Sequence, residues 1–354
     1  MLALRNVSKF LLPLIVFCFF PASQGFCQTS IDDVHIALRP AAPTISAVSS
    51  LKLEGAGIHV LRTNSRLVLV PVSVTDPMQR FVTGLNRDNF EVFEGATPQT
   101  IQHFSSEDVP VSLGIILDVS GSMADKMDRV REAVNQFCDA SNPQDEFFLI
   151  VFSDVPRLSV DFTTNPTDIK KELVFTPPKG RTSLLDAIHM GLAEMKNAKY
   201  GKKALLIISD GGDNHSRYGE REIKGLAKES DVMIYAIGIF DRYVPTQEEL
   251  RGPALLTEIA EPTGGRAFTV DNLNIIPSIA QHIGMELRTQ YVLAYRPQDL
   301  PHKGSKWRKI RVKLRLPRKF AFLQAHAKTG YYATFDSDSA FAGNEQDRTT
   351  LKSR

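Results

Sequence analysis

The sequence predicts an α/β fold, a doubly wound and mostly parallel sheet, with a flanking β-sandwich-like domain built from the segments before and after it. Two observations lead to this prediction. Between residues 107 and 288, short apolar runs alternate with stretches of helical spacing, which is typical of a parallel sheet covered by helices on both faces. On either side of that region, apolar and polar residues alternate, which is typical of half-buried antiparallel strands.

The central region contains apolar runs that are long enough for strands and too short for membrane spans. We expect buried strands in "VSLGIILDVS" at 111–120, "EFFLIVFS" at 146–153, "KALLIISDG" at 203–211, "DVMIYAIGIF" at 231–240 and "GRAFTV" at 265–270. The apolar spacing between them predicts helices over 126–140, 182–195, 219–230 and 273–288. This order of strands and helices predicts a domain over 107–288.

The flanking segments, 66–106 and 289–335, each contain only a few short strands. Such small sheets are marginally stable alone, so we expect the two segments to pair into one β domain. The stretch 306–316 alternates strictly, with basic residues on one face. A nucleic-acid interface is one interpretation of that basic stripe, but the solvated face of a half-buried strand explains it without a ligand. We therefore expect no nucleic-acid partner.

The ends of the chain have a different character. Residues 1–27 have a basic start, the apolar run "FLLPLIVFCFF" and a small-residue segment, which is the pattern of a signal peptide cleaved after Gly25 or Cys27. An uncleaved anchor, a buried helix and a lipoprotein with a modified Cys27 are the alternatives. We expect an exported protein, whether secreted, periplasmic or envelope-associated, with no membrane span once the signal is removed. Residues 28–65 read as a linker and 336–354 as a disordered tail.

The composition and the cysteine content indicate the class of protein. Hydrophobic residues make up 43% of the chain and charged residues 23%, with a formal net charge of +2, which is typical of a globular protein. After signal removal, Cys138 is the one cysteine expected in the folded core, so no disulfide framework is predicted. The sequence gives no indication of the oligomeric state.

Oxygen-bearing side chains gather at the predicted strand ends. Asp118, Ser120 and Ser122 follow the first buried strand, Asp210 follows "LLIIS", and Thr182 opens a helix after a polar turn. The carboxyl ends of parallel strands form the ligand-binding edge of an open α/β sheet. Carboxylates and hydroxyls are hard oxygen ligands that suit Mg²⁺, Mn²⁺ or Ca²⁺.

Other motifs do not fit this stretch. An EF-hand loop beginning at Asp118 requires glycine at position 6 and glutamate at position 12, where Met123 and Arg129 stand. The G-x-S-x-G pattern of a serine nucleophile fails at Ser120 and at Ser122.

The motif "DVSGS", followed by "GRTSLLDAI" and "ISDGGDN", resembles the von Willebrand factor type A domain and its metal-ion-dependent adhesion site. The resemblance covers about residues 109–288 and implies a Rossmann-like fold. The whole chain is also similar to the secreted VWFA-related proteins of Acidobacteria, through "VSVTD…GLNRDNFEVFE" and "YVLAYRP…WRKIRVKL".

The resemblance implies that Asp118, Ser120, Ser122, Thr182 and Asp210 ligate a divalent cation, Mg²⁺ first, with Mn²⁺ or Ca²⁺ as alternatives. It further implies that a protein partner offers an Asp or Glu side chain to that cation, as in cell adhesion. We therefore expect a binding module and not an enzyme. The alternatives are an envelope protein whose metal is purely structural and a metal-dependent hydrolase. Asp186, Asp213 and His215 are weaker candidates that loop solvation or helix-start electrostatics also explain.

Overall fold

The largest sheet has six strands in the computed structural model, which describes residues 67–210, 212–240, 247–297 and 306–333. All of these belong to one compact unit, residues 62–354. In spatial order the strands are β10 (Ala267–Val270), β9 (Met233–Ile239), β8 (Lys202–Ser209), β5 (Val111–Asp118), β6 (Glu146–Phe152) and β7 (Pro156–Thr163). Neighbouring strands are parallel except β6 and β7, which are antiparallel. The predicted fold class is confirmed.

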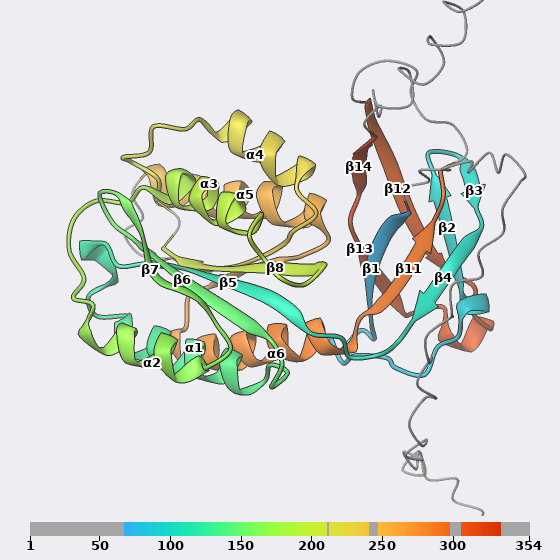
Figure 1. Ribbon diagram of the computed structural model, residues 1–354, viewed down its shortest axis with the longest axis horizontal. Helices are drawn as coiled ribbons and strands as arrows, with labels where there is room; N and C mark the ends of the chain where they lie inside the picture. Colours follow the sequence, from blue (N-terminus) through green and yellow to red (C-terminus); the bar gives the residue numbers. More distant parts are fainter. Residues whose placement is uncertain (1–66, 211, 241–246, 298–305, 334–354) are drawn as a thin grey trace, which may run out of the picture. The chain divides into compact units, whose positions relative to one another are not determined.

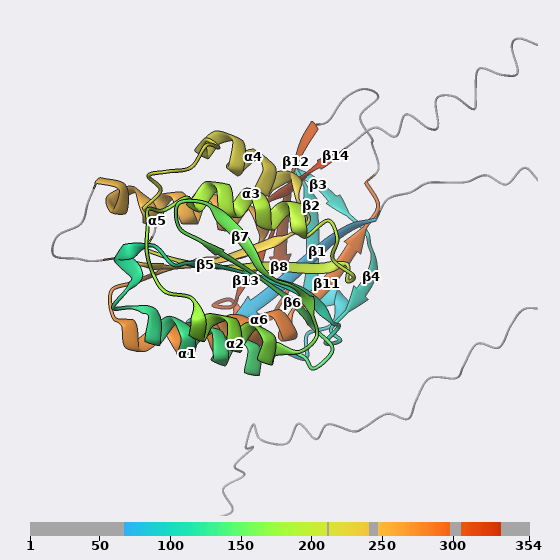
Figure 2. The same cartoon turned by 60° about the vertical axis from the view of Figure 1, so that its left-hand side comes forward.

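Helices cover both faces of this sheet (Figures 1 and 2). One face packs against α1 (Met127–Asp139), α2 (Pro166–Phe175) and α6 (Ile276–Thr289). The other face packs against α3 (Leu184–Glu194), α4 (Glu220–Glu229) and α5 (Gln247–Ala260). Because both faces are covered, the residues of β5, β6 and β9 are buried along their whole length, as their apolar sequences require.

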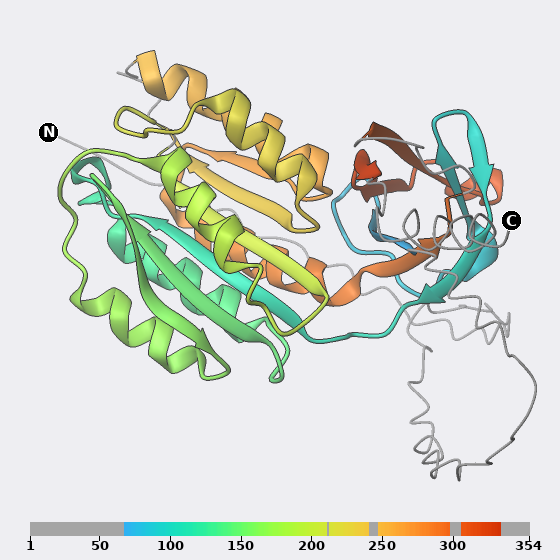
Figure 3. The same ribbon diagram turned by 45° about the horizontal axis from the view of Figure 1, so that its top comes forward.

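Two four-stranded antiparallel sheets form the flanking β region. The first has the order β13 (Gln324–Ala327), β1 (Val68–Thr75), β11 (Tyr291–Tyr295) and β4 (Ile101–Ser105). The second has the order β14 (Gly330–Ala333), β12 (Lys306–Leu314), β2 (Phe90–Glu94) and β3 (Thr97–Gln99). Each sheet therefore combines strands from before and after the α/β region, which Figure 3 shows as blue and cyan strands beside orange and red ones.

The antiparallel sheets share one apolar core. Val70, Val72 and Val74 of β1 are buried in it, together with Tyr291, Leu293 and Tyr295 of β11. One face of each alternating strand supplies this core. The other face of β12 carries the basic residues 309, 311 and 313, which are exposed, as the solvated-face interpretation predicts.

Three elements of the sheet region were not predicted from the sequence: β7, α2 and α5. The predicted signal peptide, the linker and the C-terminal tail lie outside the described residues. The independent folding of 107–288 and of the paired flanking segments stays a prediction. Within the described ranges, no helix has both the length and the apolar character that crossing a bilayer requires.

Candidate functional site

Two aspartates stand at the carboxyl edge of the central sheet. Asp118 is the last residue of β5, and Asp210 directly follows β8. These strands are parallel neighbours, with Leu117 paired to Ile208, so their ends bring both carboxylates to the same edge. Both side chains are buried, because Asp118 is 0% exposed and Asp210 is 2% exposed. The structure thus places together the two acids that the sequence motif singled out.

The Asp118 carboxylate is held by two hydrogen bonds. Its Oδ1 accepts from the Ser120 backbone N–H at 2.9 Å, and its Oδ2 accepts from the Ser209 hydroxyl at 2.6 Å. Burial, and next the negative charge of Asp210, raise the pKa of Asp118 to about 7, although the hydrogen bonds act in the opposite direction. The pair of buried carboxylates is therefore electrostatically unfavourable without a positive charge beside it.

The two serines of the motif lie next to each other. The hydroxyl oxygens of Ser120 and Ser122 are 3.1 Å apart. Ser120 is buried, whereas Ser122, in the short 3₁₀ turn Gly121–Met123, is exposed. The cluster therefore reaches solvent on the side of Ser122.

Thr182 is fixed to the loop that follows Asp210. Its backbone N–H donates to Asn214 Oδ1, and its carbonyl accepts from the backbone N–H groups of Asn214 and His215, each at 3.1 Å. Thr182 is 4% exposed and lies two residues before α3. The loop carrying the hydroxyl and the loop carrying the second carboxylate thus hold each other in place.

The Thr182 loop is also bonded to the loop that carries the serines. The Gly121 N–H donates to the Gly180 carbonyl at 3.0 Å, and the Lys179 N–H donates to the Val119 carbonyl at 2.8 Å. All three loops that carry the five predicted residues are therefore joined by backbone hydrogen bonds. Such an arrangement holds the three loops in fixed positions relative to one another.

A lysine lies beside the second carboxylate. The Nζ of Lys126 is 3.4 Å from Oδ2 of Asp210, and the Lys126 side chain is only 15% exposed. Neither Lys126 nor Ser209 was singled out from the sequence. Ser209 directly precedes Asp210 in "IISDG", so its place at a strand end is the signal that could have found it.

Two of the three weaker candidates, Asp186 and Asp213, make hydrogen bonds between the site's loops. Asp186, buried in the first turn of α3, accepts hydrogen bonds from the backbone N–H groups of Arg217 and Tyr218. Asp213 accepts from the Leu185 N–H. These contacts hold the loop after β8 against the start of α3. His215 is exposed, with its Nδ1 3.4 Å from Arg181 Nη1.

The donor set fits a hard divalent cation. The cluster offers two carboxylates and hydroxyl oxygens, which are the ligand types that Mg²⁺, Mn²⁺ and Ca²⁺ accept. Over the described ranges, no group of three or more His, Cys, Asp and Glu side chains is arranged to hold a metal ion. A cation at this edge would therefore need the hydroxyls as well as the two acids, and the close pair Ser120 and Ser122 supplies them.

Comparison with known families supports the interpretation of the fold. Residues 113–212 match the model of the von Willebrand factor type A domain, and all five predicted ligands lie within that stretch. An uncharacterized protein of Borreliella burgdorferi is 24% identical over 182 residues, which are 45% of this chain. The chain spans about half the length of that curated relative, since the match covers 53% of it.

Some solved structures are similar to this chain at low sequence identity. A von Willebrand factor type A protein from Catenulispora acidiphila is 12% identical, with 82% of this chain and 79% of that chain covered and a TM-score of 0.46. BatB from Bacteroides thetaiotaomicron is 20% identical, with 50% and 98% covered and a TM-score of 0.40. The same domain of the pilus tip protein Mfa5 from Porphyromonas gingivalis is 14% identical, with 51% and 97% covered and a TM-score of 0.40. The similarity to secreted proteins of Acidobacteria stays a prediction.

Proposed function

We propose that this protein, whose residues 113–212 match the model of the von Willebrand factor type A domain, is an exported, non-enzymatic module that binds a protein partner through a divalent cation. Domains of this family typically mediate protein–protein interaction and adhesion. The observation that carries the proposal is the pair of buried carboxylates beside two adjacent hydroxyls at one edge of the sheet. The N-terminal signal-like pattern, which lies outside the described residues, motivates the export.

The five residues have distinct roles in this proposal. Asp118 and Asp210 neutralise the cation's charge, and Ser120, Ser122 and Thr182 add neutral oxygens, directly or through water. Ser209 holds the Asp118 carboxylate in orientation through its hydroxyl. Because Ser122 is exposed, the cluster is open to an incoming group on that side.

A bound divalent cation would supply a solvent-facing coordination position, and its charge favours an anionic ligand there. The carboxylate of an Asp or Glu on the partner is the ligand we propose. Exposed basic side chains support this choice, because Lys179 and Arg181 shortly precede Thr182 in the same loop, and Arg217 lies on the neighbouring loop. Charges of this kind steer an acidic group to the site.

A hollow near the start of α1 is more acidic. Asp125, Asp128 and Asp271 line it, together with Arg129, and its volume is about 730 Å³. A partner that also contacts this hollow would present a basic patch next to its carboxylate.

The test is Mn²⁺-dependent relaxation of water protons with the full chain. We expect bound Mn²⁺ to enhance relaxation, since exchangeable water remains on it, and acetate to lower the enhancement by displacing that water. The variant Asp118→Asn should show no enhancement above free Mn²⁺. Asp139→Asn is the matched control, because Asp139 is the last residue of α1 and its side chain, which pairs with Lys170, is 62% exposed.

Two outcomes would contradict the proposal in different ways. A bound Mn²⁺ that acetate leaves unaffected is a structural ion that only fastens the loops. An absence of Mn²⁺ binding by the wild type removes the metal-dependent function altogether.

A further inference from the structure

The buried acidic cluster already contains one positive charge from the chain itself. Lys126 precedes the first residue of α1, and its ammonium group is directed back to the Asp210 carboxylate, with Nζ and Oδ2 3.4 Å apart. The Lys126 side chain is 15% exposed and that of Asp210 is 3% exposed. The electrostatic attraction between two charges so shielded from water is stronger than that of a pair on the surface.

We propose that Lys126 is a built-in counter-ion of the site, which lowers its affinity for a divalent cation and raises the affinity of the loaded site for an anionic ligand. This inference rests on the proposed metal binding at Asp118 and Asp210. Its two effects have opposite signs, and both follow from the charge of one side chain.

Counting charges gives the direction of each effect. Two ionised aspartates and one divalent cation sum to zero. The lysine leaves the loaded site with one net positive charge. Like charges at short range repel, so Lys126 opposes the cation. The remaining positive charge attracts a carboxylate, so Lys126 favours the partner's acidic group.

A purely structural salt bridge would behave differently. If Lys126 only held α1 to the loop after β8, neutralising it would loosen the site, and the affinity for the cation would fall or stay the same. The counter-ion role requires the affinity to rise. The sign of the change therefore separates the two roles.

The experiment is calorimetric titration of Mg²⁺ into the full chain, carried out on four proteins. Lys126→Met removes the charge and keeps most of the side-chain volume, and Lys126→Arg keeps the charge. Lys224→Met is the matched control, because Lys224 pairs with Glu220 and Glu258 on the surface. We expect Lys126→Met to bind Mg²⁺ about tenfold more tightly than the wild type. The other two variants should stay within about twofold of it.

A second readout uses the anion. With Mn²⁺ bound, acetate should displace water from Lys126→Met only at several-fold higher concentration than from the wild type. Tighter cation binding together with weaker acetate binding supports the inference. Binding of Mg²⁺ by Lys126→Met alone, with none by the wild type, supports only the first of the two effects and overturns the proposed function.

Other outcomes overturn it. If the wild type binds Mg²⁺ and Lys126→Met binds it equally or more weakly, the counter-ion role is wrong while the proposed function stands. If neither protein binds Mg²⁺, the counter-ion role and the proposed function are both wrong. If Lys126→Arg gains affinity as Lys126→Met does, the effect is due to shape and not to charge, and the inference is wrong.

Discussion

Gly180 shows how one residue without a side chain places the Thr182 loop. Its φ of +87° lies in the left-handed region that favours glycine. A Cβ there would stand 2.6 Å from the Oδ2 of Asp154, whose other oxygen accepts the Arg181 N–H at 3.0 Å. The carbonyl of Gly180 accepts the Gly121 N–H, so a shift here would be transmitted to the serine loop.

We expect Gly180→Ala to lower the free energy of unfolding by at least about 1–2 kcal/mol, the cost of a left-handed conformation for a residue with a Cβ. It should also weaken Mg²⁺ binding, because the loop that carries Thr182 must move. Urea denaturation and calorimetry measure the two effects. Gly201→Ala is the control, since no atom lies within 4 Å of a Cβ built there. Equal effects of both substitutions would contradict this account.

The sequence located the acids and hydroxyls of the site because strand ends follow from hydrophobic pattern, and parallel strands end at one edge. It could not locate Lys126 or Ser209 as contacts, because nothing in their spacing specifies a rotamer. The positive φ of Gly180 likewise depends on the packing of Asp154. Whether the five predicted residues ligate a metal stays a prediction.

At the scale of elements, the buried strands could be predicted from the sequence. One strand and two helices with a weaker sequence signal could not. β7 is a half-exposed antiparallel edge strand, so it has no continuous apolar run. The start of α2 did carry a signal, since Asn165 accepts the Thr167 N–H as the N-cap and Pro166 follows it. α5 contains Pro253, a residue that normally argues against a helix.

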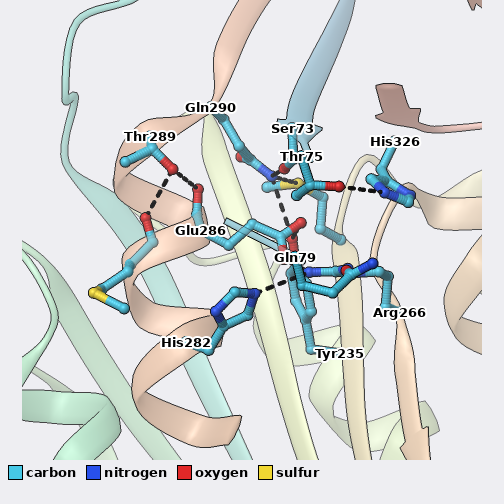
Figure 4. A network of polar contacts seen from close by, with 12 residues as sticks. Ser73, Thr75, Gln79, Tyr235, Arg266, His282, Glu286, Thr289, Gln290 and His326 are labelled. Carbon is cyan, nitrogen blue, oxygen red and sulfur yellow. Dashed lines mark hydrogen bonds and ion pairs between the residues drawn. The ribbon is translucent and has the colours of Figure 1, made fainter. Parts of the chain in front are cut away.

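A buried polar network connects elements on both sides of the α6–β11 junction (Figure 4). Arg266, next to β10, forms an ion pair with Glu286 of α6, which is fully buried. Glu286 also accepts the Tyr235 hydroxyl at 3.1 Å, and Gln290 donates to Tyr235 and to Ser73 of β1, each at 3.2 Å. The network thus links the parallel sheet to the first antiparallel sheet.

We expect Arg266→Met to destabilise the protein by about 3–5 kcal/mol, because it leaves the Glu286 carboxylate buried without its cation. Adding Glu286→Gln should restore a large part of that loss, since the amide needs no counter-charge. Urea denaturation of the single and double variants measures the coupling. Additive losses in the double variant would show that the ion pair does not act as a unit.

At the scale of the whole molecule, the flanking β region depends on both of its segments. β1 pairs only with β11 and β13 among the described strands, and β2 pairs with β12 on one side. The segment before the α/β region therefore keeps little pairing of its own, namely β2 with β3.

Fragments test this dependence. We expect residues 107–288 to fold alone, and residues 28–106 to stay unfolded or aggregate unless residues 289–335 are supplied. Circular dichroism and urea denaturation of the purified fragments give the result. Cooperative unfolding of 28–106 by itself would count against a shared domain.

Two histidines near the network predict how stability depends on pH. Burial, and next the charge of Arg266, lower the pKa of His282 and of His326, whereas Glu286 acts in the opposite direction. His282 Nε2 lies 3.5 Å from Arg266 Nη2, and His326 Nε2 lies 3.2 Å from Thr75 Oγ1. The folded protein therefore prefers both rings neutral.

Since the unfolded chain binds these protons more readily, their contribution to stability is present above about pH 6.5 and is lost as the pH falls through the lowered values. We expect these two rings to lower the urea midpoint between pH 7.5 and pH 5, whereas Asp118, with its raised pKa, acts in the opposite direction over the same range. The combined change His282→Gln and His326→Gln should remove the part that is due to the rings, so that its midpoint at pH 5 rises relative to the wild type. His103→Gln is the control, because His103 is exposed. An unchanged pH dependence in the double variant would rule out these rings as its source.

The central claim is that five oxygen-bearing residues form a working cation site, and thermal unfolding with Mg²⁺, Mn²⁺, Ca²⁺ or EDTA tests it most directly. We expect an ion at a hundredfold excess over its dissociation constant to stabilise the wild type by about 2.7 kcal/mol. Asp118→Asn should gain nothing, and in EDTA it should be as stable as the wild type or more so, because the repulsion from Asp210 is gone. The claim would be contradicted if none of the three ions, at millimolar concentration, changed the melting temperature of the wild type.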